Sequence, residues 1–359
     1  MILRELALRD FRSYDRGAFS FSPGVNIIRG DNGKGKTNLL EGIWLLTGVR
    51  SWRSGKKAEL VRWEREKALL RGTAETRGRN FILELELPRT GRTQVRVNGV
   101  KKQRQQELSG QLQCVLFSPE DLFLVKGPAA ERRAFLDRAV SQLRPRYGEY
   151  LARYQRVLDS KSRLLKDGEG KAIDPLLDAY DAQLAALGSH LLGYRARFCR
   201  GLGEECGKMH AAISGGQEVL SLCYHTVSTV TDPFAPPAVL EGQLRDHLEG
   251  HRAAEKASQT CLSGLHRDDL LLDINEKPAR AFASQGQARS AALSLKFGER
   301  ELFFRDSGEY PVLLLDDVLS ELDGSRQRFV ATHAMGGQSI ITCCENERQF
   351  EGASLIELR

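Results

Sequence analysis

The chain has 359 residues, of which 41% are hydrophobic and 28% are charged, and its formal net charge at pH 7 is +6. No apolar run approaches the roughly 18 residues that a membrane span needs, and the opening residues, Met1 to Glu5, lack the layout of a signal peptide. Seven cysteines without a C-x-x-C pair indicate reduced thiols and exclude a disulfide framework. We therefore expect a cytoplasmic globular protein of two lobes, with no membrane segment.

The first part of the chain predicts strands that lead into a phosphate-binding loop. Residues 3–8 and 18–21 are typical of two antiparallel strands, and 25–28 of a short buried strand. Residues 30–37 fit G-x-x-x-x-G-K-[ST], the P-loop, and 38–46 are typical of the helix that follows such a loop. The residues expected around a nucleotide are Gly30, Asp31, Asn32, Gly33, Lys34, Gly35, Lys36, Thr37 and Asn38.

The chemistry of this loop predicts ATP and Mg²⁺ as cofactors. Its glycines let backbone N–H groups turn toward phosphates, and the helix N-terminus adds the positive end of its dipole. Lys36 would reach the β- and γ-phosphates, and the Thr37 hydroxyl would bind Mg²⁺.

Two basic segments follow. Residues 50–67 place Trp52 and Trp63 among arginines and lysines, where aromatic rings can stack on bases, although anchoring in the core is the interpretation that we favour for both. Residues 68–106 predict an antiparallel meander with a hairpin turn at Asn98-Gly99. Six basic residues and no acidic one lie in its second half: Arg89, Arg92, Arg96, Lys101, Lys102 and Arg104. They predict a DNA-binding surface, with 131–171 as the second choice and a merely solvated basic face as the alternative.

The composition changes from about Pro128. Residues 114–117 predict a buried parallel strand, after which helical periodicity dominates. The expected helices are 129–143, 146–166, 174–212 and 237–257. We expect an N-terminal part of the head at 1–122, a helical lobe at 123–258 and a C-terminal part of the head at 259–359.

The last hundred residues predict the second half of an ATPase site. A strand at 270–274 is followed by the polar turn at 284–287 and a helix at 288–304. Four apolar residues, 312–315, then run into Asp316 and Asp317, as in the strand whose acid helps to hold Mg²⁺. Residues 339–342 predict another central strand.

Several of these features resemble known families. Ser284-Gln285-Gly286-Gln287 resembles the signature loop of ABC-type ATPases, 313–317 resembles their Walker B strand, and 320–323 resembles their D-loop. Residues 10–14 resemble the opening of the SMC-like DNA-repair branch. Blocks at 11–14, 30–41, 117–122, 264–269 and 283–287 together resemble the RecF family of bacterial recombination mediators. This resemblance spans the chain and implies an α/β fold, an ABC-type P-loop ATPase head with an inserted, mostly helical lobe.

The resemblance also implies how the site works. In ABC-type heads the signature loop closes over ATP that the P-loop of a second copy holds, so that ATP joins a homodimer. Ser284, Gln285, Gly286, Gln287 and Asp323 would then act in trans. Lys36 and the Mg²⁺ ligands Thr37 and Asp316 would act in cis, with Asp317 polarising the attacking water and Arg12 meeting the adenine or the phosphates.

The chain departs from the broader pattern at three places. Asp317 stands where Glu is usual, and its shorter side chain implies slow turnover. Thr342-Cys343-Cys344 stands where a His often contacts the γ-phosphate, and 118–121 fills the place of a loop whose Gln usually contacts Mg²⁺.

By resemblance, the function is that of an ATP-dependent DNA-binding protein of recombinational repair, replication and the SOS response. Such a protein dimerises on ATP, is a slow DNA-stimulated ATPase, binds gapped DNA and single-strand/double-strand junctions as well as single-stranded and linear duplex DNA, and helps to load recombinase. Its partners are DNA, a second copy and recombination mediator proteins. The alternative is a non-catalytic DNA and protein scaffold with ATP as a structural ligand; a transporter subunit fits poorly, because its insertion before the signature is much shorter.

Overall fold

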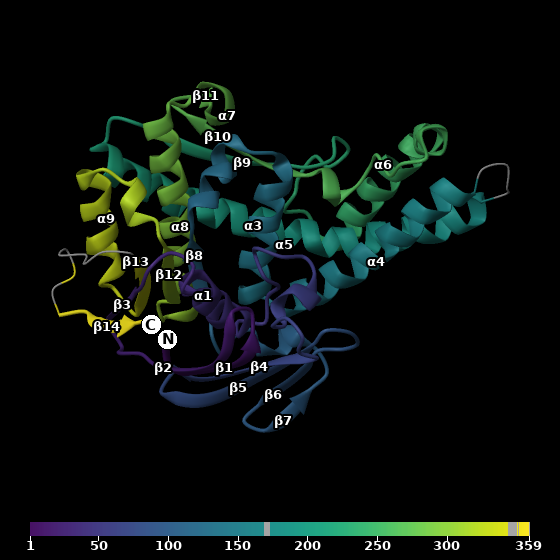
Figure 1. Ribbon diagram of the computed structural model, residues 1–359. Coiled ribbons are helices and arrows are strands. Elements are labelled where there is room, and N and C mark those ends of the chain that lie inside the picture. The colour runs from purple at the N-terminus through teal and green to yellow at the C-terminus, as the bar shows by residue number, and fades with distance from the viewer. Residues whose placement is uncertain (169–172, 344–349, 351, 359) are drawn as a thin grey trace. The chain divides into compact units, whose positions relative to one another are not determined.

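The computed structural model describes residues 1–168, 173–343, 350 and 352–358, and it divides the chain into two compact units (Figure 1). The head comprises Met1–Leu122, Glu205–Val219 and Ser284–Arg359. The lobe comprises Phe123–Glu204 and Leu220–Ala283. The α/β class predicted from the sequence is confirmed.

The boundaries between the two units in the second half of the chain lie at 204/205, 219/220 and 283/284, and the expected boundary was 258/259. Strand β10 (Asp269–Ile274) belongs with the lobe because it pairs along its whole length with β9 (Leu220–His225), a strand that the sequence analysis missed. The segment 205–219 belongs with the head. There the backbone of Cys206 lies close to Gly298: a Cβ on Gly298 would be 2.9 Å from the backbone nitrogen of Cys206.

A parallel sheet forms the centre of the head. Its strand order is β14-β3-β13-β12-β8, and every neighbouring pair is parallel. The strands are β3 (Val25–Arg29), β8 (Cys114–Phe117), β12 (Val312–Asp316), β13 (Ser339–Cys343) and β14 (Ser354–Glu357). Residues of β8, β12 and β13 are buried on both faces, as their continuous apolar runs predict. The parallel strand expected at 114–117 is confirmed, and β14 was missed.

A six-stranded antiparallel sheet, ordered β2-β1-β4-β5-β6-β7, is the second layer of the head (Figure 1). Its strands are β1 (Ile2–Phe11), β2 (Tyr14–Ser20), β4 (Lys67–Thr76), β5 (Arg79–Pro88), β6 (Gln94–Val97) and β7 (Val100–Lys102). The predicted meander and its Asn98-Gly99 turn are confirmed, and both central turn residues have the positive φ that such a turn needs.

Helix α1 (Lys36–Leu45) packs between the two layers. It contacts β1 on one side and β12 and β13 on the other, and its Leu39, Leu40, Ile43 and Trp44 belong to the head core. Gly42 has a packing reason within this helix, because a Cβ there would lie 2.9 Å from a methyl carbon of Leu8. The absence of a side chain at Gly42 thus lets α1 lie close against β1.

The remaining elements are mostly helical. In the head, α8 (Gln285–Ser307) begins three residues before the expected helix, and α9 (Gly324–Ala334) follows Asp323. The lobe contains β9, β10, β11 (Lys277–Pro278), α2 (Phe123–Lys126), α3 (Ala129–Leu143), α4 (Pro145–Asp167), α6 (Pro237–Ser258) and α7 (Ala279–Phe282). Helix α5 (Asp174–Ser214) starts in the lobe, and its last residues belong to the head.

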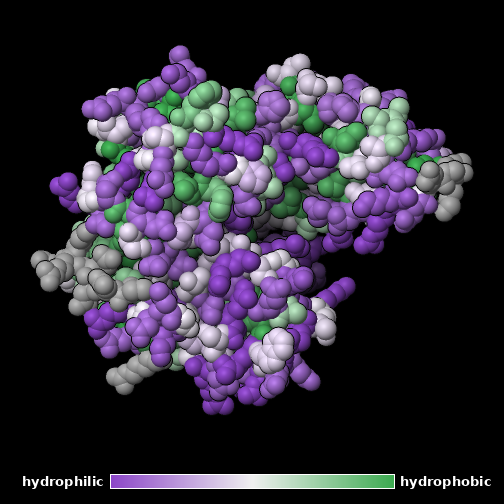
Figure 2. All heavy atoms as spheres, turned by 45° about the horizontal axis from the view of Figure 1, so that its top comes forward, coloured by the Kyte–Doolittle hydropathy of each residue, from purple (hydrophilic) through white to green (hydrophobic). Residues whose placement is uncertain are grey.

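The outer surface fits the composition. Figure 2 shows one face of the molecule, on which hydrophilic residues predominate and apolar ones form smaller groups between them. Within the part of the chain that the structure describes, no helix combines the length and the apolar character that a membrane crossing requires.

One buried amide joins the two layers of the head. Gln338, which precedes β13 and is 1% exposed, accepts a hydrogen bond from the Leu3 N–H at 2.7 Å. Its Nε2 donates to the carbonyls of Leu3 and Ser22, at 2.8 Å each. Because Leu3 is fully buried, Gln338 supplies its backbone groups with the partners that solvent cannot. The Ser22 carbonyl, on a half-buried residue, also accepts from Asn26 Nδ2 at 3.0 Å.

We predict that Gln338→Leu lowers the free energy of unfolding by roughly 2–5 kcal/mol, because the buried N–H and C=O groups of Leu3 lose a partner. Denaturation with urea measures the change. Gln94→Leu, on an exposed position of β6, is the control and should stay within about 0.5 kcal/mol of the parent. Equal stability of the two variants would contradict the role assigned to Gln338.

Candidate nucleotide-binding site

The predicted P-loop connects the carboxyl end of β3 to the N-terminus of α1. Gly33 and Gly35 have φ values of 85° and 93°, which an L side chain adopts only with strain. A Cβ on Gly35 would also lie 2.8 Å from Ser13 Oγ. No side chain caps α1. Its first N–H groups therefore remain available to an anion held in the loop.

The other loop residues line its rim. Asp31, Asn32, Gly33 and Lys34 are exposed, and the buried Lys36 donates from Nζ to the carbonyl oxygen of Gly30 at 2.5 Å. The ammonium is thus folded over the loop that it closes. A phosphate oxygen would be a stronger acceptor for it than a carbonyl, because both partners would then be charged.

Tyr14 holds the loop from the β1–β2 hairpin. Its hydroxyl donates to the Gly35 carbonyl at 3.1 Å. Burial raises the pKa of Tyr14 to about 12, so the hydroxyl stays protonated at neutral pH and keeps this donor.

Two predicted Mg²⁺ ligands meet at the end of the central strands. Thr37 Oγ1 lies 3.0 Å from Asp316 Oδ1, and Thr342 Oγ1 donates to the same carboxylate oxygen at 2.9 Å. Burial raises the pKa of Asp316, the hydroxyls of Thr342 and Thr37 oppose the shift, and the nearby Glu120 carboxylate adds to it. A buried carboxylate with hydroxyl partners is stabilised by a cation.

The spacing of these oxygens fits Mg²⁺. Two neighbouring ligands of an octahedral Mg²⁺, each about 2.1 Å from the metal, lie about 3 Å apart, which is the Thr37–Asp316 separation. Among the described residues, no group of three or more His, Cys, Asp or Glu side chains could hold a metal ion. In nucleotide sites Mg²⁺ usually takes one or two carboxylates from the protein and its other ligands from phosphates and water.

Asp317 leaves the strand in a left-handed conformation, with φ 52°. Its N–H donates to Thr342 Oγ1 at 2.9 Å, so the hydroxyl that holds Asp316 also fixes the backbone of Asp317. Thr342 is a functional candidate that the sequence analysis named only as a replacement for a His. Its signal was its place at the end of a buried strand; Cys344 lies outside the described residues.

Arg12 is oriented by a buried acid. It donates to both carboxylate oxygens of Glu41 at 2.8 Å, and to the Glu59 carbonyl at 3.0 Å. Glu41 is fully buried and also accepts from Ser51, at 2.5 Å. Arg12 could therefore reach a nucleotide only through its remaining N–H groups or after leaving Glu41. The sequence analysis named Glu41 only within the block at 30–41 and assigned it no role.

Asn38 continues this cluster beside the loop. Its amide donates to Ser13 Oγ at 2.9 Å and accepts from Arg53 at 2.8 Å. Arg53 lies 3.5 Å from Glu41 as well, and its side chain is 38% exposed. An exposed guanidinium next to the P-loop helix is a further candidate for contact with a nucleotide, and no pattern in the sequence points to it.

The predicted trans-acting loops are two helix N-termini. The exposed Ser284 caps α8, since its Oγ accepts from Gln287 N–H at 3.2 Å while the Gln287 side chain accepts from Ser284 N–H at 2.8 Å. Asp323 caps α9 by accepting from the N–H groups of Ser325 and Arg326, at 3.1 and 3.0 Å. Gln285 is exposed and Gly286 is half-buried.

The basic hairpin, which carries the six basic residues between 89 and 104, is only partly free for a ligand. Arg89 donates to the carbonyls of Arg62 and Arg65 at 2.9 and 3.0 Å, so it joins the hairpin to the preceding basic segment. Lys102 is half-buried, and Arg104 precedes a 3-10 turn, Gln105–Leu108. Arg92, Arg96 and Lys101 are exposed and make no ion pair with any residue that the structure describes. Arg96 and Lys101 are direct cross-strand partners.

One interpretation of the tryptophans is wrong. Trp52 packs edge-to-face on the buried Trp44, with ring centroids 5.8 Å apart. Trp63, however, is 82% exposed and anchors no core. It stands between Arg62 and Arg65, the two residues whose carbonyls hold Arg89.

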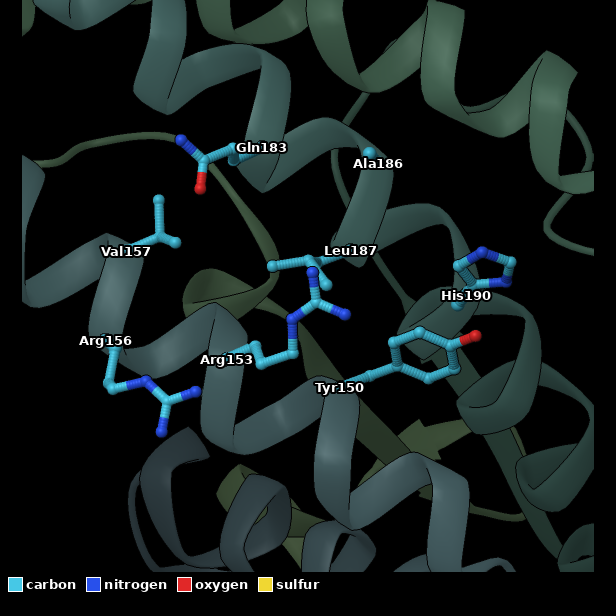
Figure 3. A pocket seen from close by; sticks show the side chains of 8 residues that line it. All are labelled: Tyr150, Arg153, Arg156, Val157, Gln183, Ala186, Leu187 and His190. Carbon is cyan, nitrogen blue, oxygen red and sulfur yellow. The ribbon is translucent and has the colours of Figure 1, made fainter.

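The second basic region contains a hollow between α4 and α5, of about 380 Å³ (Figure 3). Arg153 and Arg156 extend into it from α4, and Tyr150 stacks on His190 of α5 with ring centroids 4.6 Å apart. Arg132, by contrast, is 3% exposed and paired with Asp269 at 2.7 Å, so it belongs to the lobe core.

Comparisons with known proteins identify the family. A model described as the RecF/RecN/SMC N terminal domain matches residues 2–358. The chain is 39% identical to the DNA replication and repair protein RecF of Clostridioides difficile (strain 630), over 96% of this chain and 92% of that protein. It is 43% identical to the protein of the same name from Synechococcus sp. (strain JA-3-3Ab), over 91% and 87%.

Solved structures agree with this assignment. A structure described as the recombination mediator protein RecF-ATPrS in the RecFOR pathway has a TM-score of 0.92 and 33% identity, and covers 100% of this chain and 96% of that one. An Smc head domain from Pyrococcus furiosus has a TM-score of 0.54 at 16% identity, over 99% of this chain and 94% of that one, and supports the ATPase-head fold alone. The chain belongs to the RecF/RecN/SMC family, and within that family to RecF.

Proposed function

We propose that the chain is an ATP-dependent DNA-binding protein of recombinational repair and replication, whose heads pair over ATP and hydrolyse it slowly. The observation that carries this proposal is the Thr37–Asp316 contact of 3.0 Å, which joins two motifs 279 residues apart in the sequence. The names of the curated RecF relatives, and the ATP-bound state of a solved relative, support the same function.

In the cis site, P-loop N–H groups and Lys36 hold the phosphates, while Thr37 and Asp316 hold Mg²⁺. Held there, the ion would offset the negative charge of the phosphates. Asp317 accepts the proton of the attacking water, and Thr342 orients both acids through its hydroxyl. An Asp in this role is one methylene shorter than Glu, which favours slow turnover.

The trans contribution comes from the N-terminus of α8. Ser284 is exposed there, at the positive end of a helix of 23 residues, which favours the γ-phosphate of a second copy. Gln285, Gly286, Gln287 and Asp323 belong to the same proposed surface. ATP then lies between two heads, and hydrolysis releases them.

The DNA surface that we favour combines Arg92, Arg96 and Lys101 with the exposed Trp63. The arginines and the lysine bind phosphates, and the indole ring stacks on an unpaired base. Such a mixture suits gapped DNA and single-strand/double-strand junctions, alongside single-stranded and linear duplex DNA. Assistance in loading recombinase, and contact with other mediator proteins, extend the proposal by family membership.

We predict that two inactive variants complement each other. Lys36→Ala removes the cation that holds the phosphates, and Ser284→Arg blocks the closing surface without touching ATP in the same chain. In a mixed dimer one composite site carries both defects and the other carries neither, so ATPase activity that neither variant shows alone should return.

The complementation assay measures ATP hydrolysis across mixing ratios, with dimer formation followed by sedimentation. A site confined to one chain gives no recovery at any ratio. Flat activity with confirmed mixed dimers would therefore defeat the paired-head proposal and leave an ordinary P-loop ATPase. An unchanged ATP affinity of Lys36→Ala would defeat the nucleotide site itself.

We predict that Thr342→Val retains ATP binding but lowers turnover roughly 10- to 100-fold, the usual effect of removing a group that orients a metal ligand. Single-turnover hydrolysis and equilibrium binding separate the two effects. Thr332→Val, which removes an exposed hydroxyl on α9, is the matched control and should hydrolyse ATP normally. Normal turnover in Thr342→Val would contradict the orienting role of Thr342 toward Asp316 and Asp317. A non-catalytic scaffold has no turnover to lose, so a loss of turnover in the variant would argue against that alternative.

We predict that replacing Arg92, Arg96 and Lys101 with Gln weakens DNA binding for all sequences and leaves ATP binding intact. Each lost phosphate contact should flatten the slope of log affinity against log salt by roughly 0.9 for duplex DNA. Lys208, Arg245 and Lys277, three exposed cations elsewhere, replaced by Gln give the control with the same change of charge. An unchanged slope would move the DNA footprint, first to Arg153 and Arg156 in the lobe.

A further inference from the structure

Arg326 of α9 joins the two predicted trans-acting loops within one chain. Its guanidinium donates to the Gly286 carbonyl at 2.9 Å and to Ser290 Oγ at 2.9 and 3.1 Å. The same side chain is paired with the Asp323 carboxylate. One residue therefore contacts the signature loop, the first turns of α8 and the cap of α9.

The shape of the Arg326 guanidinium allows it to hold the two loops at once. Arginine carries five N–H donors in a rigid plane, so it can hold acceptors on two elements in a fixed mutual orientation. The side chain is 22% exposed, and a Cβ on Gly286 would lie 3.3 Å from its Nη2. The glycine thus leaves the space through which the arginine reaches the loop carbonyl.

A second set of contacts holds the first turns of α8. Gln287 donates to Glu218 at 2.8 Å, and the second oxygen of Glu218 lies 3.1 Å from His210 Nε2. His210 is fully buried, and its Nδ1 lies 3.1 Å from Ser294 Oγ on α8. The signature loop is therefore held through Gly286 by Arg326 and through Gln287 by Glu218.

We propose that Arg326 is a positioning residue that makes the signature loop and the D-loop move as one body, so that a head presents both loops to a second copy together. The inference rests on the proposed pairing of heads over ATP. Closing a composite site requires a signature loop at the phosphates and a D-loop at the interface. If the two loops moved independently, each productive closure would require two separate rearrangements, and their free-energy costs would add.

The test uses the full chain with Arg326→Gln, and Arg328→Gln as a matched control. Arg328→Gln removes the same charge from the same helix, and the Nε of Arg328 donates within that helix, to the Gly324 carbonyl at 3.2 Å. The dissociation constant of the dimer is measured by sedimentation with a slowly hydrolysed ATP analogue and Mg²⁺. ATP affinity is measured on the monomer at low protein concentration.

For Arg326→Gln we expect a monomer ATP affinity within about twofold of the parent and a dimer dissociation constant raised roughly tenfold or more, since hydrogen bonds from a charged donor are lost. Arg326→Lys should lie between the two, because an ammonium satisfies one acceptor at a time. Arg328→Gln should match the parent. Hydrogen exchange supplies the second readout: ATP should protect 284–290 and 320–326 together in the parent, and separately in Arg326→Gln.

Normal dimerisation of Arg326→Gln, with both segments still protected together, overturns the inference. So does a variant that loses ATP affinity and thermal stability along with dimerisation, because Arg326 would then support the head as a whole. A parent chain that stays monomeric with ATP, Mg²⁺ and DNA defeats the proposed function first, and the inference with it.

Discussion

The head depends on one constraint, which is the register of three parallel strands. Thr342 of β13 pairs with Asp316 of β12 on one side and with Ile28 of β3 on the other. Because carboxyl ends of parallel strands meet at one edge, this register places Asp316 and Thr342 beside the P-loop that leaves β3. A shift of one residue in β13 would turn the Thr342 hydroxyl to the other face of the sheet and separate the two acids from it.

The buried carboxylate at that edge requires rigid packing in the core of the head. A carboxylate as buried as Asp316 is costly unless hydroxyls or a cation attend it, so its neighbours must be held rigidly. Helix α1 supplies Thr37 and is fixed by packing between the two layers of the head, where Gly42 allows β1 to come close. Gln338 then joins the layers through buried backbone groups. The position of the Thr37 hydroxyl beside Asp316 therefore depends on both layers of the head.

Local patterns were enough to predict the P-loop, the Walker B strand, the buried strand at 114–117 and the Asn98-Gly99 hairpin. They failed where a residue acquires its role from a distant partner. Strand β9 has no strong signal of its own and exists through its pairing with β10. Glu41 looks like an ordinary helix residue until Arg12, Ser51 and Arg53 gather around it. Trp63 was misjudged because composition alone does not separate an exposed ring from one that anchors the core.

The two halves of the proposed composite site complement each other physically. The P-loop side brings Lys36 to the phosphates but also two acids, Asp316 and Asp317, whose charge opposes that of ATP. The signature side brings an exposed helix N-terminus, which attracts anions. In a two-fold dimer each head gives one half and receives the other, so both ATP sites form in a single association step. Joining the signature loop to the D-loop through Arg326 serves this geometry, because a self-complementary interface closes only when all its parts keep their relative positions.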